Sequence, residues 1–269
     1  DTGRILAWLY GPELQARALL RAGVDVSASS LEVLDAIVAA ARQDGTHARV
    51  HICVDTGLAR EGVRPEGLPA LLDTALAADD AVTVVGLWSH FAWADQPGHP
   101  TIDAQAGVFR DALAVTEERG IALEVRHLAN SAATLTRPDL HFDLVRPGIA
   151  IYGLPPVEDP AGEGFGLEPA MRVTASLALV KDVPAGQGVS YGHDYVTDRP
   201  TRLGLVTAGY ADGVFRSAGN RAEVAVGGRR HRIAGRVCMD QVVLDLGPDA
   251  TERAGDEVVL VGADGPGAR

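Results

Sequence analysis

Two short segments of the chain place polar groups directly after an apolar run. Residues 127–131 read HLANS, and residues 146–149 read RPGI. A strand that ends in this way exposes backbone N–H groups, which suit an anionic group such as phosphate. Arg146 falls at the end of the second apolar run, and in a β/α barrel that is where chemistry is done. Taken alone, the two segments are equally typical of ordinary loops with an exposed arginine.

Further polar motifs occur in both halves of the chain. Residues 55–57 read DTG with Arg60 nearby, residues 89–91 read SHF, and residues 189–192 read VSYG. Near the end of the chain, residues 209–213 read GYADG and residues 236–240 read RVCMD. A tyrosine after a glycine at a strand end, such as Tyr210, can lie exposed and exchange a proton. A lone tyrosine is more often a half-buried core residue, so the interpretation depends on the motifs together.

The first half alternates apolar runs with segments of helical period. The expected strands are Ile5–Tyr10, Val24–Ser27, Val50–Asp55, Val82–Trp88, Leu123–His127 and Phe142–Arg146. The expected helices cover about 12–22, 30–43, 66–79, 102–119 and 131–136. This order predicts a parallel sheet with crossover helices, and the continuous apolar runs predict strands buried on both faces. About six βα units are present, whereas a closed barrel needs eight. No GxGxxG motif follows the first strand, so a dinucleotide fold is unsupported.

The composition changes at residues 154–169, where four prolines and several glycines indicate a linker. Short alternating strands separated by Gly and Pro turns follow. They are expected at Val173–Lys181, Leu203–Ala208, Ala222–Val226, Arg229–Ala234, Val242–Leu246 and Glu257–Val261. We therefore expect an incomplete β/α barrel over residues 1–165 and a β domain over residues 166–269.

Composition excludes several classes of partner. A net charge of −12 over 269 residues disfavours nucleic acid and anionic membranes, both of which need basic patches. Cys53 and Cys238 form neither a disulfide framework nor a zinc signature, so no metal is expected. No apolar run approaches the roughly 18 residues of a membrane span, and no signal peptide opens the chain. These features favour the cytoplasm.

Six of these motifs resemble those of the alanine racemases, a family of fold-type III pyridoxal-phosphate enzymes, and they occur in the family's order. In chain order they are DTG with Arg60, SHF, HLANS, RPGI, GYADG and RVCMD. The resemblance covers essentially the whole chain. It implies a (β/α)8 barrel of the TIM type, incomplete here, followed by a C-terminal β domain. It also implies racemisation of L-alanine and D-alanine by two bases, with pyridoxal 5'-phosphate as cofactor. The expected assembly is a homodimer with sites shared between subunits, supplying D-alanine for peptidoglycan.

The resemblance assigns one set of residues to the cofactor. Arg146 corresponds to the arginine facing the pyridine nitrogen; because arginine stays protonated, it donates to that nitrogen without readily protonating it. His127 corresponds to the residue that orients Arg146, and His90 lies by the cofactor ring and bonds the catalytic tyrosine. The remaining implied cofactor-binding residues are Asn130, Ser131, Gly148 and Ile149.

A second set is implied for catalysis and substrate. Tyr210 corresponds to one of the two acid/base residues and acts in the partner subunit's site. Arg60 and Met239 correspond to residues that hold the substrate carboxylate. Tyr191, Arg236 and Asp95 correspond to residues of a narrow access corridor, with Tyr191 also contacting substrate; ordinary surface charges are the alternative for the corridor.

Two departures from the family pattern stand out. The lysine that forms the Schiff base, in a Lys-Ala-Asn-x-Tyr-Gly context, is absent, and the one lysine of the chain, Lys181, lies in the β domain. The family's C-terminal tyrosine, which reaches the cofactor phosphate, is also absent. The chain by itself is therefore expected to be inactive. In addition, Cys53 stands where many relatives have a lysine modified to a carbamate that orients the substrate-binding arginine, so another group must position Arg60.

Two other functions stay open on the sequence. A different fold-type III enzyme, such as a broad-specificity racemase or a decarboxylase, is one; a decarboxylase is expected to place a carboxylate, not Arg146, at the pyridine nitrogen. A non-catalytic cofactor-binding relative is the other. The complete reading frame distinguishes them, because an upstream lysine motif supports the enzyme.

Overall fold

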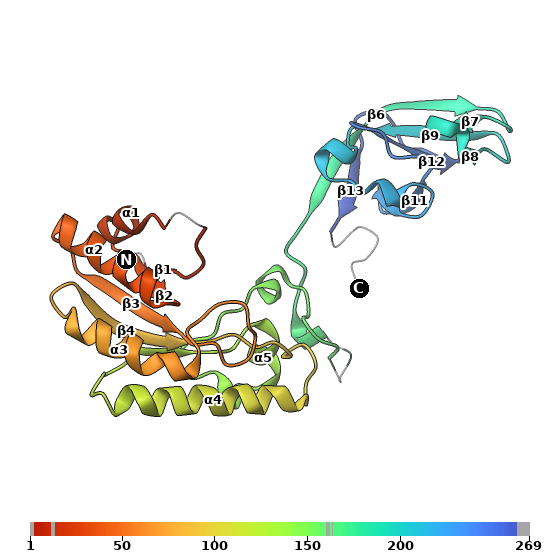
Figure 1. Cartoon of the computed structure of the whole chain (residues 1–269). Helices are drawn as coiled ribbons and strands as arrows, with labels where there is room; N and C mark the ends of the chain where they lie inside the picture. Colours follow the sequence, from red (N-terminus) through yellow and green to blue (C-terminus); the bar gives the residue numbers. More distant parts are fainter. Residues whose placement is uncertain (1–2, 12–13, 160–161, 163, 263–269) are drawn as a thin grey trace. The chain divides into compact units, whose positions relative to one another are not determined.

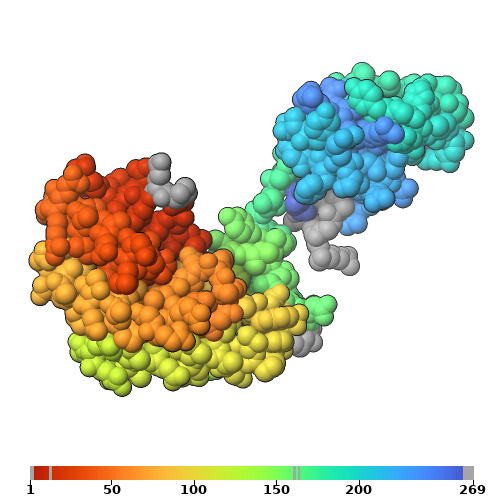
Figure 2. Space-filling model, in the orientation of Figure 1, coloured from red at the N-terminus to blue at the C-terminus, as the bar shows by residue number. Residues whose placement is uncertain are grey.

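The computed structural model describes residues 3–11, 14–159, 162 and 164–262. The chain forms two compact units, Asp1–Leu167 and Glu168–Arg269 (Figure 1). Each unit has its own apolar core. In Figure 2 the first unit is coloured red to green and the second teal to blue. Within the described ranges, no helix has both the length and the apolar character needed to cross a bilayer.

The first unit is built on a five-stranded sheet in which all neighbouring strands are parallel. Its strands are β1 (Leu6–Ala7), β2 (Asp25–Ala28), β3 (Ala48–Cys53), β4 (Val82–Trp88) and β5 (Val125–His127). They lie side by side in chain order. A doubly wound sheet would reverse its order at a switch point, whereas a barrel winds in one direction. The expected barrel-type fold is therefore confirmed.

Helices connect these strands. They are α1 (Ala16–Arg21), α2 (Leu31–Asp44), α3 (Leu68–Ala77), α4 (Pro100–Glu117) and α5 (Ser131–Thr136). The longer ones have clear boundaries: Ser30 caps α2 by accepting from the amide of Val33, and Gly45 ends it with a φ of 61°. Because right-handed crossovers in a singly wound sheet place all helices on one side, the opposite side of the sheet stays free for other groups (Figure 1).

The two sides of the sheet differ in chemistry. Val26, Ala28, Val50 and Ile52 are fully buried and belong to the apolar core formed with the helices. Side chains alternate along a strand, so the intervening residues point the other way. We call that side the inner face; its residues are Asp25, Ser27, Arg49, His51, Cys53, Trp88 and His127. The strands are thus apolar toward the helices and largely polar inside.

The sixth expected strand, Phe142–Arg146, is much reduced. Only Leu144 pairs with the sheet, through a single parallel bridge to His127. Phe142 has a φ of 51°, which interrupts an extended backbone, and the Asp143 carboxylate bonds Arg126 instead of continuing a ladder. The segment still directs Arg146 to the carboxyl end of β5.

The second unit is a closed barrel of antiparallel strands in the order β10-β11-β12-β9-β6-β13. Their bounds are β6 (Val173–Val183), β9 (Thr201–Val206), β10 (Glu223–Val226), β11 (Arg229–Ile233), β12 (Val242–Gly247) and β13 (Glu257–Val261). Burial alternates along β12, where Val242, Leu244 and Leu246 point into the core. A small hairpin of β7 (Gly188–Val189) and β8 (Tyr195–Val196), which the sequence analysis did not predict, is added to it.

Candidate active site

Arg146 is a half-buried charged group at the carboxyl end of the first sheet. Its Nη1 donates to His127 Nδ1 at 2.7 Å, and its Nη2 donates to the carbonyl of Ser89, also at 2.7 Å. The guanidinium carbon lies 5.2 Å from the ring centres of both Trp8 and Trp88. Burial lowers the pKa of Arg146 to about 10, so it remains a cation at neutral pH. The faces of the two indole rings stabilise this positive charge through cation–π interactions.

Two histidines flank this guanidinium. His90 Nδ1 lies 3.5 Å from Arg146 Nη2, and the His90 ring stacks on Trp8 at 6.1 Å between centres. Burial, with Arg146 next in importance, lowers the pKa of His90 to about 4 and that of His127 to about 2. Both imidazoles are therefore neutral at physiological pH, and each offers one acceptor nitrogen.

The start of α5 forms a compact turn around Ser131. Its hydroxyl oxygen accepts from the backbone amides of Gly148, at 2.7 Å, and Ala150, at 3.3 Å. Asn130 caps the helix by accepting from the Ala133 amide at 3.1 Å. Asn130 therefore has a local structural role here, while Ser131 holds the segment containing Gly148 and Ile149 against the start of α5.

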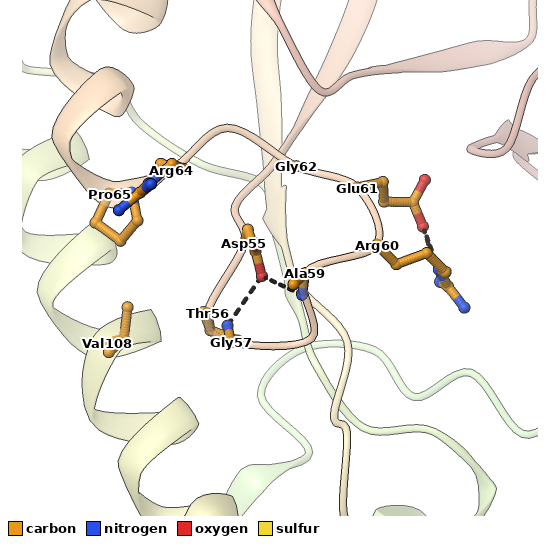
Figure 3. Close-up of a pocket in the computed structure, with 10 residues that line it drawn as sticks. All are labelled: Asp55, Thr56, Gly57, Ala59, Arg60, Glu61, Gly62, Arg64, Pro65 and Val108. Atoms are coloured by element: carbon orange, nitrogen blue, oxygen red, sulfur yellow. Dashed lines mark hydrogen bonds and ion pairs between the residues drawn. The ribbon is translucent and has the colours of Figure 1, made fainter.

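A cavity of about 600 Å³ lies along the loop between β3 and α3 (Figure 3). Asp55 shapes this loop, because one carboxylate oxygen accepts from the amides of Gly57, at 2.9 Å, and Ala59, at 3.0 Å. Arg60, which also lines the cavity, pairs with the carboxylate of its neighbour Glu61 at 2.8 Å.

Cys53 ends β3 directly below this loop. It is buried, and burial raises the pKa of its thiol above the ordinary value, so it stays protonated. A thiol in this state offers Arg60 no charge. The anion beside Arg60 in the structure is the carboxylate of Glu61.

Gln105, on α4, was not identified from the sequence. Its amide nitrogen donates to Thr56 Oγ1 and to the His90 carbonyl, both at 3.1 Å. Its amide oxygen accepts from the Ala92 amide at 2.9 Å, and Thr56 Oγ1 in turn lies 2.8 Å from Ser89 Oγ. One buried glutamine thus joins the loops that follow β3 and β4. A glutamine on the buried face of an amphipathic helix was the available signal.

In the second unit, Tyr210 stands on a turn that is fixed to a neighbouring loop. The amide of Tyr210 donates to the Cys238 carbonyl at 3.0 Å, and the amide of Ala211 donates to the Met239 carbonyl at 2.8 Å. A Cβ on Gly209 would lie 2.2 Å from the Met239 carbonyl oxygen, so this close approach requires glycine. The turn brings Tyr210 and Met239 together and leaves the tyrosine ring 41% exposed.

The residues predicted for the access corridor are all exposed. Arg236 forms an ion pair with Asp194 at 2.5 Å, and Tyr191 lies on the adjoining turn. Asp95 lies in the loop after β4, on the first unit. The predicted residues thus form two sets, one on each unit. The first set is Arg60, His90, Asp95, His127, Asn130, Ser131, Arg146, Gly148 and Ile149; the second is Tyr191, Tyr210, Arg236 and Met239. In the part of the chain that is described, no group of three or more His, Cys, Asp or Glu residues is arranged to hold a metal ion.

A singly wound parallel sheet with a cationic, aromatic-walled centre at its carboxyl end defines a β/α-barrel enzyme. Comparison with known proteins makes this class specific. The family model "Alanine racemase, N-terminal domain" matches residues 1–156, and "Alanine racemase, C-terminal domain" matches residues 170–268. The chain belongs to the alanine racemase family, which confirms the resemblance stated above and the prediction of a racemase enzyme.

Individual relatives show the extent of the likeness. The alanine racemase of Salinispora arenicola is 54% identical over 97% of this chain and 70% of its own length. That of Mycobacterium tuberculosis is 51% identical over 100% of this chain and 69% of its own. The crystal structure of alanine racemase from D-cycloserine-producing Streptomyces lavendulae matches with a TM-score of 0.89 at 51% identity, covering 97% of this chain and 69% of that one.

Proposed function

We propose that this chain is part of a pyridoxal-phosphate-dependent enzyme that interconverts L-alanine and D-alanine in the cytoplasm and supplies D-alanine for peptidoglycan. The observation that carries the proposal is the Arg146 centre, a half-buried cation that contacts two indole rings and two neutral histidines. The relatives that match nearly the whole chain, all named alanine racemases, support the substrate.

The residues present fit this cofactor. Arg146 Nε is buried and, within the described residues, has no hydrogen-bond partner. An unprotonated pyridine nitrogen is an acceptor that would satisfy such a donor. Ser131 would hold the phosphate together with the amides of Gly148 and Ile149, since hydroxyls and backbone N–H groups are its usual ligands. His90 would contact the ring.

When bound, the cofactor withdraws electrons from the substrate and so acidifies its Cα proton. Arg146 limits how far this goes. Because arginine donates a hydrogen bond but keeps its proton, Arg146 would not protonate the ring nitrogen. This favours return of the proton to Cα over side reactions, and it disfavours a decarboxylase, for which a carboxylate is expected at this position.

Proton transfer is assigned to Tyr210 on one face of the substrate. A free tyrosine has a pKa of about 10, so it needs neighbours such as His90 to act near neutral pH. Arg60 and the Met239 amide would hold the substrate carboxylate, and Tyr191, Arg236 and Asp95 would narrow the approach to the site. We propose a homodimer in which Tyr210 serves the partner subunit's site.

The second base is proposed to be the lysine that also carries the cofactor. The only lysine in the sequence is Lys181, which lies on β6 of the second unit. We infer that the required lysine lies outside residues 1–269 and that residues 1–269 alone are inactive. The chain matches 69–70% of the length of two relatives, so part of each relative lies outside the match.

The test uses the enzyme expressed from its complete reading frame. Replacing Tyr210 by Phe removes only the hydroxyl, and loss of a positioned acid/base typically lowers kcat by about 10²–10⁴-fold. The rate at which the substrate Cα proton exchanges with deuterated solvent measures this loss of proton transfer separately for L-alanine and D-alanine. Cofactor absorbance should be retained, since Ser131 and Arg146 are unchanged.

A mixing experiment tests the shared site. Inactive Tyr210→Phe protein combined with an inactive variant of the cofactor-bearing lysine should regain activity, because some mixed dimers contain one intact site. Mixed dimers that form yet stay inactive would contradict the shared-site proposal.

A further inference from the structure

A line of hydrogen bonds crosses the inner face of the first sheet and ends at Arg146. Arg146 Nη1 lies 2.7 Å from His127 Nδ1, and His127 Nε2 lies 2.9 Å from His51 Nδ1. His51 Nε2 lies 3.3 Å from Asp25 Oδ2. Asp25 opens β2 and His127 closes β5, so the line runs from the amino end of the sheet to its carboxyl end.

Only one arrangement of protons satisfies every bond in this line. Arginine can only donate, so His127 Nδ1 must be bare and accept. A neutral His127 then carries its proton on Nε2 and donates it to His51 Nδ1. His51 in turn carries its proton on Nε2 and donates to the Asp25 carboxylate, which can only accept.

The surrounding residues are shaped to hold this line. His51 and His127 are 3% and 0% exposed. Opposite His51, a Cβ on residue 86 would lie 2.2 Å from His51 Nδ1, so Gly86 leaves the space that the ring occupies. Trp88 stacks on His127 with ring centres 5.9 Å apart and 6° between planes.

Asp25 is a buried acceptor whose charge is balanced locally. Its side chain is 5% exposed and contacts the guanidinium groups of Arg4 and Arg49. The same two arginines also contact Glu124, which is half exposed. Within the described residues, the carboxylate that bonds His51 is that of Asp25, not that of Glu124. The cluster therefore has two carboxylates, and the bond to the histidine line comes from Asp25.

We propose that Asp25 is a positioning residue for Arg146: acting through His51, it fixes both imidazoles as Nε2–H tautomers, so that His127 always presents a bare Nδ1 to the guanidinium. The low pKa of both histidines agrees with neutral rings. Without a terminal acceptor, either ring can reverse, and a reversed His127 would direct N–H toward N–H and displace Arg146. The catalytic consequence rests on the proposed function; the tautomers do not.

The direct test is ¹⁵N NMR of the chain labelled at its eight histidines, with His51→Gln and His127→Gln variants to assign the two signals. We expect both rings to carry their proton on Nε2 throughout pH 6–8. A proton on Nδ1 of either ring overturns the proposal; the tautomers are read in the unmodified chain, and the two variants serve only to assign the signals.

Variants separate positioning from simple structural support. Asp25→Ala should release the tautomers, giving mixed or reversed His51 and His127 signals. Asp25→Asn keeps an acceptor oxygen and should restore the Nε2–H form of both rings. Glu124→Ala, the matched control in the same ion cluster, should leave both tautomers unchanged. If Glu124→Ala disturbs the histidines as much as Asp25→Ala does, or if Asp25→Ala leaves them unchanged, Asp25 has no such role.

The enzyme expressed from its complete reading frame gives the second readout. Loss of the outer partner of a metal-ligating histidine typically costs about 10–100-fold. By analogy we expect kcat to fall by roughly this factor in Asp25→Ala and to recover largely in Asp25→Asn. Cofactor absorbance monitors Arg146 independently of turnover. Unchanged kcat and absorbance beside altered tautomers would overturn the link to Arg146. If no variant and no parent racemises alanine, the proposed function fails, while NMR still decides the role of Asp25.

Discussion

The inner face of the first sheet and the interior of the second unit differ in the side chains that they bury. The first buries arginine, aspartate and two histidines, each paired along one line of hydrogen bonds. The second fills its closed barrel with valine, leucine and isoleucine, and carries Tyr210 and Met239 on exposed turns. The proposed functional groups of the first unit are therefore part of its core, whereas those of the second unit lie on its surface. The difference predicts where chemistry and stability are coupled.

The largest expected effect is at Gly86. In Gly86→Ala the new methyl group would meet the His51 ring at 2.2 Å, so ring and strand must move. Overpacking of this kind costs about 1–3 kcal/mol in unfolding free energy. The hydrogen bonds that His51 makes with His127 and Asp25 should be lost as well. Urea unfolding of the chain measures the first effect.

Gly107→Ala is the matched control for that prediction. Gly107 lies inside α4, where an added Cβ meets no atom within 4 Å. Replacing a helical glycine should raise stability by roughly 0.5–1 kcal/mol. If the urea midpoint of Gly86→Ala is not lower than that of Gly107→Ala, the inner face accepts an added methyl group more easily than its geometry indicates.

An intermediate effect is expected from pH. Unfolded histidine has a pKa of about 6.5, whereas that of folded His127 is lowered to about 2 by burial and by Arg146. Below pH 6.5 the unfolded chain therefore binds more protons, and stability falls as the pH falls. This one residue should contribute up to about 1.4 kcal/mol per pH unit.

Unfolding free energies at pH 6.5, 6.0, 5.5 and 5.0 provide the measurement. His127→Gln lowers stability overall but should show a shallower slope than the parent, because the variant lacks this titrating group. Parallel slopes would mean that His127 is protonated in the folded chain, contrary to its role as acceptor for Arg146.

The smallest expected effect is on stability at Tyr210. Its ring is 41% exposed, and the bonds that fix the turn come from backbone groups. Tyr210→Phe should therefore change the unfolding free energy by less than about 0.5 kcal/mol, even though kcat falls sharply. A large loss of stability would remove the contrast between the two units.

Much of the fold follows from sequence periodicity. Continuous apolar runs such as Val82–Trp88 predict buried parallel strands, and alternation around Val242–Leu246 predicts a β domain. The closure of that domain into an antiparallel barrel was not predicted. Two features escaped this approach for physical reasons. The strands β7 and β8 have two residues each, too few to show a period. The Phe142–Arg146 segment looks extended, but the positive φ of Phe142 cannot be read from an apolar pattern.

The site was predicted unevenly. Motif resemblance predicted roles for Arg146, His127 and Tyr210, whereas His51 and Asp25 were not singled out, because each is an isolated polar residue within an apolar strand. Their signal was the two-residue spacing of 25 and 27 and of 49 and 51, which marks one face of each strand. The significance of Gly86 depends on strand register, which pairs it with His51 across two strands and which sequence alone does not supply.

The two indole rings beside Arg146 have a consequence for observation. All three tryptophans of the chain, Trp8, Trp88 and Trp93, lie in the first unit, and two of them contact the Arg146 guanidinium. Intrinsic tryptophan fluorescence therefore reports on the first unit, and two of its three sources lie beside the Arg146 cation. Denaturation followed by fluorescence and by far-UV circular dichroism should separate melting of the first unit from melting of the β-barrel, without any label or engineered probe.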